Sequence, residues 1–185
     1  MRKFNVALKV CAIVALALVL GSGCTKSKDP YASYTQEREE GLIREWLDAA
    51  VAADKDIDTT ATGLYYIVNK VGTGDNVKAG DTVTVKYIGA YTDGTIFDAS
   101  AFHTSQTGTT LPYFSADSTY TYIHQSPTSA TLSLILGWEE GIEYLSKGGS
   151  ATFLFPSAKA YGSGGSYSIP PYSPLLFVID VVDIK

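Results

Sequence analysis

The hydrophobic pattern of this 185-residue chain changes near residues 54–60, and that change limits the folds open to it. From 36 to 53, apolar residues recur every three to four positions, as on one face of an amphipathic helix. After Gly63, apolar and polar residues alternate in short runs separated by turn residues, which is typical of strands. The sequence therefore predicts an N-terminal helix followed by an α+β domain of mostly antiparallel strands.

The predicted helix over 36–53 has an apolar stripe and a charged face. The stripe consists of Leu42, Ile43, Trp46, Leu47, Ala50 and Val51. The charged face consists of Glu37, Arg38, Glu39, Glu40, Arg44, Glu45 and Asp48. Ser33 and Gln36 have the spacing of a capping box at the start of the helix. The stripe can pack on the following domain or form a dimer interface; its short length favours packing over a coiled coil, and the oligomeric state stays open.

Strands are predicted at 64–71, 82–87, 132–136, 151–155 and 175–184, and turns at 72–75 and 79–81. Asp93-Gly94 is a hairpin signal. A helix is predicted over 138–145, with Trp138, Ile142 and Leu145 on one face and Gly148-Gly149 after it. Residues 99–130 are rich in Ser and Thr without a clear period, which indicates a functional loop or a hairpin hidden from pattern analysis.

The first 23 residues have the features of a secretory signal. Arg2, Lys3 and Lys9 precede or flank an apolar run over 10–20 that is too short to span a bilayer comfortably. The Gly-Ser-Gly-Cys sequence that follows resembles a bacterial lipobox, in which Cys24 would be lipidated and become the new N-terminus. A plain signal peptide and an uncleaved anchor are the alternatives. The expected location is the cell envelope, with a lipid anchor in the outer membrane, a tether over 24–35, and the membrane face left open.

Composition excludes several classes of protein. A net charge of -5 and a pI of about 4.9, with no basic stripe, argue against nucleic-acid binding. Cleavage before Cys24 would remove Cys11 and leave one cysteine, so an intramolecular disulfide is not expected and the hydrophobic core must stabilise the fold.

No metal site or nucleophile is evident from the sequence. His103 and His124 lie in the 99–130 segment without zinc-ligand spacing, and we expect both to be solvated loop residues. The glycine-rich run 161–166 lacks the Lys-Ser/Thr continuation of a phosphate loop. There is no Gly-x-Ser-x-Gly elbow, and the remaining cysteine is expected to be lipidated. We therefore expect no metal and no cofactor.

Five segments occur in the order typical of one family. They are 85–89 with 93–98, 137–141, 155–156 with 160–162, 169–171, and 175–177. Together they resemble the FK506-binding-protein (FKBP) family of peptidyl-prolyl isomerases over about Thr62 to Lys185. The resemblance implies a twisted antiparallel sheet wrapped around one short helix. It also implies an isomerase domain over 59–185, with the helix and linker at 36–58 dispensable for chemistry.

The resemblance also implies a pocket for the proline of a substrate. The residues matching it are Tyr87, Phe97, Asp98, Leu134, Ile135, Trp138, Tyr161, Ile169 and Phe177. In that match Trp138 is the floor, Phe97 and Phe177 are walls, and Leu134 and Ile135 are an aliphatic pair. Asp98 pairs with Tyr87, and the Tyr161 hydroxyl binds the substrate carbonyl. The implied substrates are unfolded or nascent exported polypeptides containing proline, and FK506-like macrolides are implied ligands. Catalysis would proceed by desolvation and preferential binding of the twisted amide.

Two departures from the family pattern affect the site. One aromatic wall residue cannot be assigned, because the segment before Gly137 is long; Tyr113, Phe114, Tyr120 and Tyr122 are the candidates. Ser168 stands where an apolar residue is common. A non-catalytic chaperone or adaptor with the same fold is therefore an alternative function. A glycan-binding lipoprotein would explain the 13 tyrosines but not the ordered segments.

Overall fold

The structure is a computed structural model that describes residues 31–100, 102–104, 110–112 and 119–185, with 102–104 and 110–112 as backbone only. The chain divides into two units, Met1–Ala32 and Ser33–Lys185. Of the first unit, only Tyr31 and Ala32 are described, both in a turn. The predicted signal and Cys24 lie outside the described residues. The second unit contains the fold and the candidate site.

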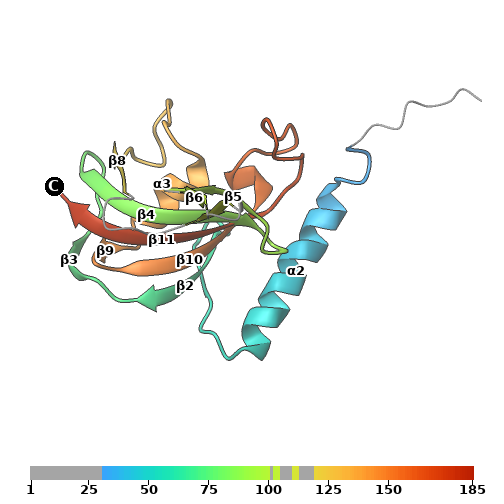
Figure 1. Cartoon of the computed structure of the whole chain (residues 1–185), viewed down its shortest axis with the longest axis horizontal. Helices are drawn as coiled ribbons and strands as arrows, with labels where there is room; N and C mark the ends of the chain where they lie inside the picture. Colours follow the sequence, from blue (N-terminus) through green and yellow to red (C-terminus); the bar gives the residue numbers. More distant parts are fainter. Residues whose placement is uncertain (1–30, 101, 105–109, 113–118) are drawn as a thin grey trace, which may run out of the picture. The chain divides into compact units, whose positions relative to one another are not determined.

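A 7-stranded antiparallel sheet forms the centre of this unit, in the order β1-β2-β10-β11-β4-β5, with β8 also paired to β4 (Figure 1). Its strands are β1 (Asp58–Thr59), β2 (Tyr65–Lys70), β4 (Thr82–Tyr91), β5 (Ile96–Ala99), β8 (Tyr120–Ile123), β10 (Ser150–Phe155) and β11 (Leu175–Ile184). Two small antiparallel sheets pair β3 (Thr73–Asn76) with β9 (Ser146–Lys147), and β6 (Phe102–Thr104) with β7 (Thr110–Pro112). The predicted α+β fold with an antiparallel sheet is confirmed.

The short helix α3 (Leu136–Ile142) packs against the sheet and closes the core. Trp138, Ile142 and Leu145 are all buried, so the predicted apolar face is confirmed. Gly141 permits close packing, because a Cβ at this position would lie 3.0 Å from the ring of Phe153 on β10. The helix therefore lies directly on the aromatic side chains of the sheet.

Three predictions around α3 need correction. Residues 132–136 do not form a strand: the chain bends over 131–135, and α3 runs from Leu136 to Ile142 rather than over 138–145. The reason is that Leu134 and Ile135 face a cavity, while the Ser133 amide donates to the side chain of Gln125 instead of a neighbouring strand. Residues 73–76 form β3 rather than a turn, since they pair with β9. The 99–130 segment contains β6, β7 and β8, as the hairpin alternative anticipated.

The N-terminal helix α2 (Gln36–Ala52) ends one residue before the predicted boundary. The capping-box prediction is wrong: Thr35 is the N-cap and accepts from the Arg38 amide, while Gln36 donates to Glu40. The apolar stripe is only partly buried, and Val51 is 67% exposed. Glu39, expected on the solvated face, is buried. No helix in the described ranges has the length and apolar character needed to cross a membrane.

Candidate functional site

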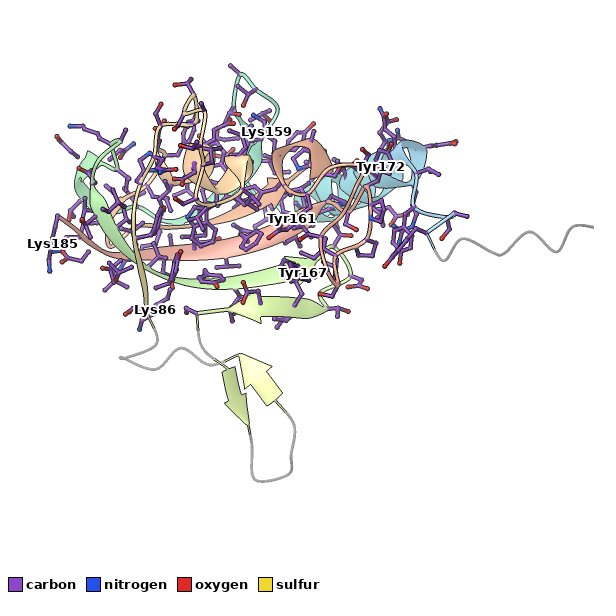
Figure 2. All side chains as sticks on the ribbon, turned by 90° about the horizontal axis from the view of Figure 1, so that it is seen from above. Lys86, Lys159, Tyr161, Tyr167, Tyr172 and Lys185 are labelled. Carbon is purple, nitrogen blue, oxygen red and sulfur yellow. The ribbon has the colours of Figure 1, made fainter. Side chains whose placement is uncertain are left out.

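A cavity of about 560 Å³ opens where α3, four strands of the sheet and the loop between β10 and β11 meet. Tyr87, Asp98 and Phe177 come from β4, β5 and β11, and Trp138 comes from α3. Tyr161 enters from the β10–β11 loop, which also carries Tyr167 and Tyr172 (Figure 2). The full lining is Tyr87, Asp98, Tyr120, Ser133, Leu134, Ile135, Leu136, Trp138, Ala160, Tyr161 and Phe177.

Aromatic rings form the base of this cavity. The Trp138 indole is 4% exposed and meets two rings edge-on: Tyr87 at a centroid distance of 5.0 Å and Phe177 at 5.5 Å. Such edge-to-face contacts favour one ring orientation. The Trp138 Nε1 donates to the Tyr122 hydroxyl at 2.9 Å, which satisfies the one polar atom of the buried indole. The result is a rigid apolar surface with its polar groups turned away or paired.

Polar groups lie at the rim of the cavity. The Tyr87 hydroxyl donates to Asp98 Oδ2 at 3.0 Å, and the Ala99 amide donates to Asp98 Oδ1 at 2.8 Å. Burial, then the negative charge of Asp98 and this hydrogen bond, raise the pKa of Tyr87 well above its usual range. Burial, followed by the Asp98 charge, also raises the pKa of Tyr161. Both phenols therefore stay protonated near neutral pH and can donate hydrogen bonds.

The structure brings most of the predicted pocket residues together. All of them except Phe97 and Ile169 line the cavity. Phe97 lies behind the wall, with its ring 5.7 Å from Phe177 and 5.2 Å from Tyr91. Ile169 is 8% exposed in the core cluster, and its backbone bridges that of Ser166. Phe97 therefore contacts the lining residue Phe177, and Ile169 is part of the core cluster.

The unassigned wall position coincides with β8. Tyr120 lines the cavity and its ring lies 6.1 Å from that of Tyr87, whereas Tyr122 lies beneath Trp138. Tyr113 and Phe114 lie outside the described residues. The alternating Tyr-Thr-Tyr over 120–122 is a sequence signal for this wall, but it is too short to establish a strand period. Ser133, Leu136 and Ala160 also line the cavity and were missed, because no side-chain chemistry distinguishes them.

The prediction that His124 is a solvated loop residue is wrong. It follows β8 and is 1% exposed. Its Nδ1 lies 2.7 Å from Glu139 Oε2, and its Nε2 lies 3.0 Å from Glu143 Oε1. The pairing of β8 with β4 places the ring beside Glu139 of α3 and Glu143, the residue that caps the C-terminus of α3. The side chain of His103 lies outside the described residues. Within the described ranges, no cluster of His, Cys, Asp or Glu could hold a metal ion.

A second ion pair lies at the base of the β10–β11 loop. Lys159 Nζ contacts Glu140 Oε2, and the hydroxyls of Thr60 and Thr62 donate to Glu140 Oε1. Burial raises the pKa of the Glu140 carboxyl, but the hydrogen bonds from Lys159, Thr62 and Thr60 outweigh it and leave the pKa below its usual range. Glu140 therefore ties the segment before β2 and the β10–β11 loop to α3.

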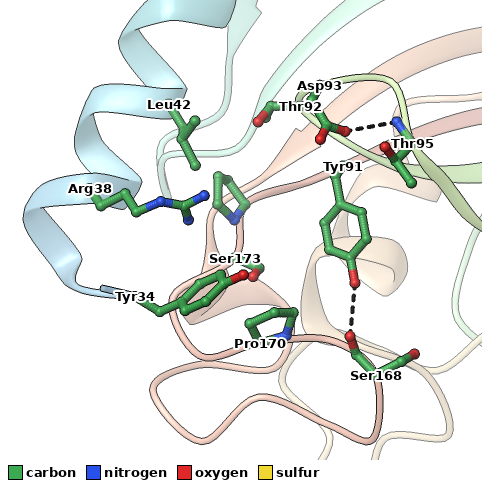
Figure 3. Close-up of a pocket in the computed structure, with 11 residues that line it drawn as sticks. Tyr34, Arg38, Leu42, Tyr91, Thr92, Asp93, Thr95, Ser168, Pro170 and Ser173 are labelled. Atoms are coloured by element: carbon green, nitrogen blue, oxygen red, sulfur yellow. Dashed lines mark hydrogen bonds between the residues drawn. The ribbon is translucent and has the colours of Figure 1, made fainter. Parts of the chain in front are cut away.

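A second cavity of about 360 Å³ lies between α2, the β4–β5 turn and the β10–β11 loop (Figure 3). Arg38 and Leu42 line it from α2, and the Arg38 guanidinium lies 4.7 Å from the centroid of the Tyr34 ring. The Tyr91 hydroxyl donates to the Ser168 carbonyl at 3.1 Å across its wall. This hydrogen bond connects β4 to the β10–β11 loop, which also contributes Ala160 and Tyr161 to the larger cavity.

Comparisons with known proteins agree with this geometry. A probable FKBP-type peptidyl-prolyl cis-trans isomerase of Haemophilus influenzae is 34% identical over 151 residues, covering 81% of this chain and 53% of the relative. The FKBP-type peptidyl-prolyl cis-trans isomerase FkpA of Escherichia coli is 35% identical over 135 residues, covering 72% and 42%. The chain thus spans about half the length of these relatives.

Solved structures show the same fold. The crystal structure of FkpA from Escherichia coli matches with a TM-score of 0.58 and 26% identity, over 100% of this chain and 74% of that one. A peptidyl-prolyl cis-trans isomerase from Pseudomonas syringae matches with a TM-score of 0.60 and 24% identity, over 82% and 96%, a likeness of fold. The family described as FKBP-type peptidyl-prolyl cis-trans isomerase matches residues 74–182, more than half of the chain. The chain belongs to the FKBP-type peptidyl-prolyl cis-trans isomerases.

Proposed function

We propose that this protein accelerates cis-trans rotation about X-Pro bonds in polypeptides. The observation that carries the proposal is the 560 Å³ cavity, which the buried Trp138 indole lines together with the hydrogen-bonded pair of Tyr87 and Asp98. A proline ring fits such an apolar recess, while the flanking peptide groups remain within reach of the rim. Family membership supports the same activity.

Rotation about a prolyl amide needs no covalent step. Resonance gives the C–N bond partial double-bond character and a barrier of roughly 18–20 kcal/mol. The planar amide separates charge and is stabilised by water, whereas the twisted amide has lost this resonance. A dry aromatic recess around the proline therefore disfavours the planar ground state relative to the twisted state, and catalysis follows from that difference.

Each rim group has a role in this mechanism. Tyr161 donates its phenolic hydrogen to the substrate carbonyl and so holds the peptide with its proline in the recess. Asp98 fixes the Tyr87 hydroxyl, so that the Tyr87 ring stays edge-on to Trp138.

The apolar side chains of the cavity exclude water from the proline ring; they are Leu134, Ile135 and Phe177. A macrolide of the FK506 type would compete for the same cavity.

The first prediction concerns Tyr161. We expect the full chain to isomerise a proline-containing tetrapeptide, and Tyr161→Phe to lower kcat/KM only several-fold, because one hydrogen bond contributes roughly 0.5–1.5 kcal/mol net. The rate should vary little between about pH 7 and pH 9, because the raised pKa of Tyr161 keeps its phenol protonated beyond the ordinary value of about 10. A coupled peptide-isomerisation assay measures both.

Tyr167→Phe is the matched control, since Tyr167 lies in the same loop and is fully exposed. It should retain parental turnover. A folded Tyr161→Phe variant without turnover, or a steep bell-shaped pH profile, would indicate acid-base chemistry and contradict the mechanism. A folded parental chain without turnover would favour the non-catalytic chaperone or adaptor instead.

We also propose that the protein is exported, lipidated at Cys24 and held at the membrane of the cell envelope, where it acts on exported polypeptides. The support is the sequence over residues 1–24: basic residues, a short apolar run, then small residues before Cys24. A lipid chain contributes membrane affinity in proportion to its buried methylene groups.

The second prediction tests this anchor. Cys24→Ser should move the protein from the membrane fraction to the soluble envelope fraction, because the serine hydroxyl replaces the thiol that would carry the lipid. Cys11→Ser is the control and should fractionate like the parent, since Cys11 lies in the apolar run. Membrane fractionation with mass spectrometry of the mature N-terminus measures the result. An unmodified Cys24 in the membrane-bound parent would contradict the proposal.

A further inference from the structure

A buried carboxylate on α2 reaches the loop that carries Tyr161. Glu39 lies on the first turns of α2, yet only 7% of it is exposed. Its Oε1 accepts from the Ser157 amide at 2.5 Å, and its Oε2 accepts from the Ser157 hydroxyl at 2.7 Å. Burying a carboxylate costs free energy unless strong hydrogen bonds compensate it. These two donors therefore fix the loop to α2.

The backbone of Ser157 holds the start of the β10–β11 loop in place through hydrogen bonds. Its carbonyl oxygen accepts from the amides of Ala160 and Gly162, both at 2.8 Å, and these two residues flank Tyr161. The Gly162 carbonyl in turn accepts from the Tyr172 amide at 3.0 Å. A displacement of Ser157 would move both amides beside Tyr161, and with them the phenol at the rim of the cavity.

The other hydrogen-bonding groups near this turn do not replace Glu39. Lys159 is held by Glu140 of α3, and this ion pair fixes the C-terminal end of the 3-10 turn over 157–159. Pro156 has no amide hydrogen to donate. Within the described ranges, the Ser157 amide and hydroxyl each have Glu39 as their hydrogen-bond acceptor. The α2 carboxylate and the α3 ion pair thus hold the turn from two directions.

We propose that Glu39 is a positioning residue for isomerisation: through Ser157 it sets the place of the Tyr161 hydroxyl. The inference rests on the proposed prolyl isomerase activity and makes α2 part of the catalytic unit. It revises the expectation that the helix and linker at 36–58 are dispensable for chemistry.

The test is a double-mutant cycle in the full chain. Glu39→Ala should lower kcat/KM several-fold and by no more than Tyr161→Phe does, since it acts only by displacing the Tyr161 hydroxyl. In the Tyr161→Phe background the same substitution should lower kcat/KM by less than about twofold, because the hydroxyl that it misplaces is already absent. A general loss of structure would reduce activity equally in both backgrounds, and that result would overturn the inference.

Conservative and neighbouring variants keep the test independent of folding. Glu39→Gln retains one acceptor oxygen and should stay within about twofold of the parent. Ser157→Ala keeps the amide bond to Glu39 and loses only the hydroxyl bond, so an intermediate loss is expected. Glu40→Ala, on the exposed face beside Glu39, should match the parent. Equal losses in Glu40→Ala and Glu39→Ala would overturn the assignment to Glu39.

Amide hydrogen exchange gives a measurement that does not depend on turnover. In Glu39→Ala, exchange at Ala160 and Gly162 should accelerate at least roughly tenfold, whereas exchange in β11 should remain at the parental rate. Unchanged exchange at these two amides would overturn the inference whatever the activity. Failure of the parent to isomerise a proline peptide, together with accelerated exchange in the variant, would instead overturn the proposed function and leave the Glu39 anchor in place as a structural contact.

Discussion

With Trp138 replaced by alanine, we expect kcat/KM for a proline tetrapeptide to fall roughly 10- to 150-fold. The indole forms the base of the cavity, and a proline ring that loses this surface gives up roughly 1.5–3 kcal/mol of apolar burial. Water would enter the space left by the ring and solvate the planar amide, which removes the preference for the twisted state. The same assay on protein shown to be folded by circular dichroism measures the change.

Part of this effect could come from reduced stability, since a large-to-small change in a core costs about 3–5 kcal/mol. Phe153→Leu is the control, because Phe153 is fully buried under α3 but does not line the cavity. It should lower the free energy of unfolding and leave kcat/KM per folded molecule near the parental value. Equal loss of kcat/KM in both variants would contradict a specific role of the indole.

We expect His124→Ala to lower the free energy of unfolding by about 3–5 kcal/mol, the range for removing one partner of a buried ion pair. The ring contacts Glu139, whose side chain is also fully buried. Each ring nitrogen lies within hydrogen-bond distance of one carboxylate oxygen, so the ring is a partner of both Glu139 and Glu143. Alanine would leave Glu139 buried without this partner. Urea unfolding followed by tryptophan fluorescence measures the loss.

Two further variants separate the buried charge from the lost volume. In His124→Leu with Glu139→Leu, no charged group of the pair remains, so this double variant should recover much of the stability lost in His124→Ala. Glu143→Ala should cost under about 1 kcal/mol, since the Glu143 side chain is 38% exposed. A double variant less stable than His124→Ala would show that the ring acts through packing rather than through charge.

The sheet was largely predictable because alternation survives in its long strands. β4 and β11 have one buried face each, so their period of two is visible in the sequence. The strand β8 was not found, because its four residues are too few to establish a period and its neighbour β4 lies far along the chain. Alternation also predicted a strand at 132–136, where Leu134 and Ile135 face a cavity instead of a sheet.

The candidate site, like the sheet, could be predicted from the sequence only in part. Tyr87, Trp138 and Tyr161 were identified because they stand in ordered segments typical of a family, and the structure places all three around one cavity. Glu39 and His124 were assigned to solvent because each stands among polar neighbours in the sequence. Their partners are contributed by distant elements, Ser157 by the β10–β11 loop and Glu139 by α3. A buried polar residue can be recognised only when its partner is known.

The place of β11 at the centre of the sheet has a consequence for folding during synthesis. This strand is the last in sequence, yet it lies between β10 and β4 and connects the two halves of the sheet. A ribosome must therefore reach Ile184 before β4 gains its central neighbour, and most pairings join segments far apart in the chain. Such high contact order slows folding. Until β11 has been synthesised, a nascent chain would therefore leave the ribosome with the two halves of its sheet unjoined.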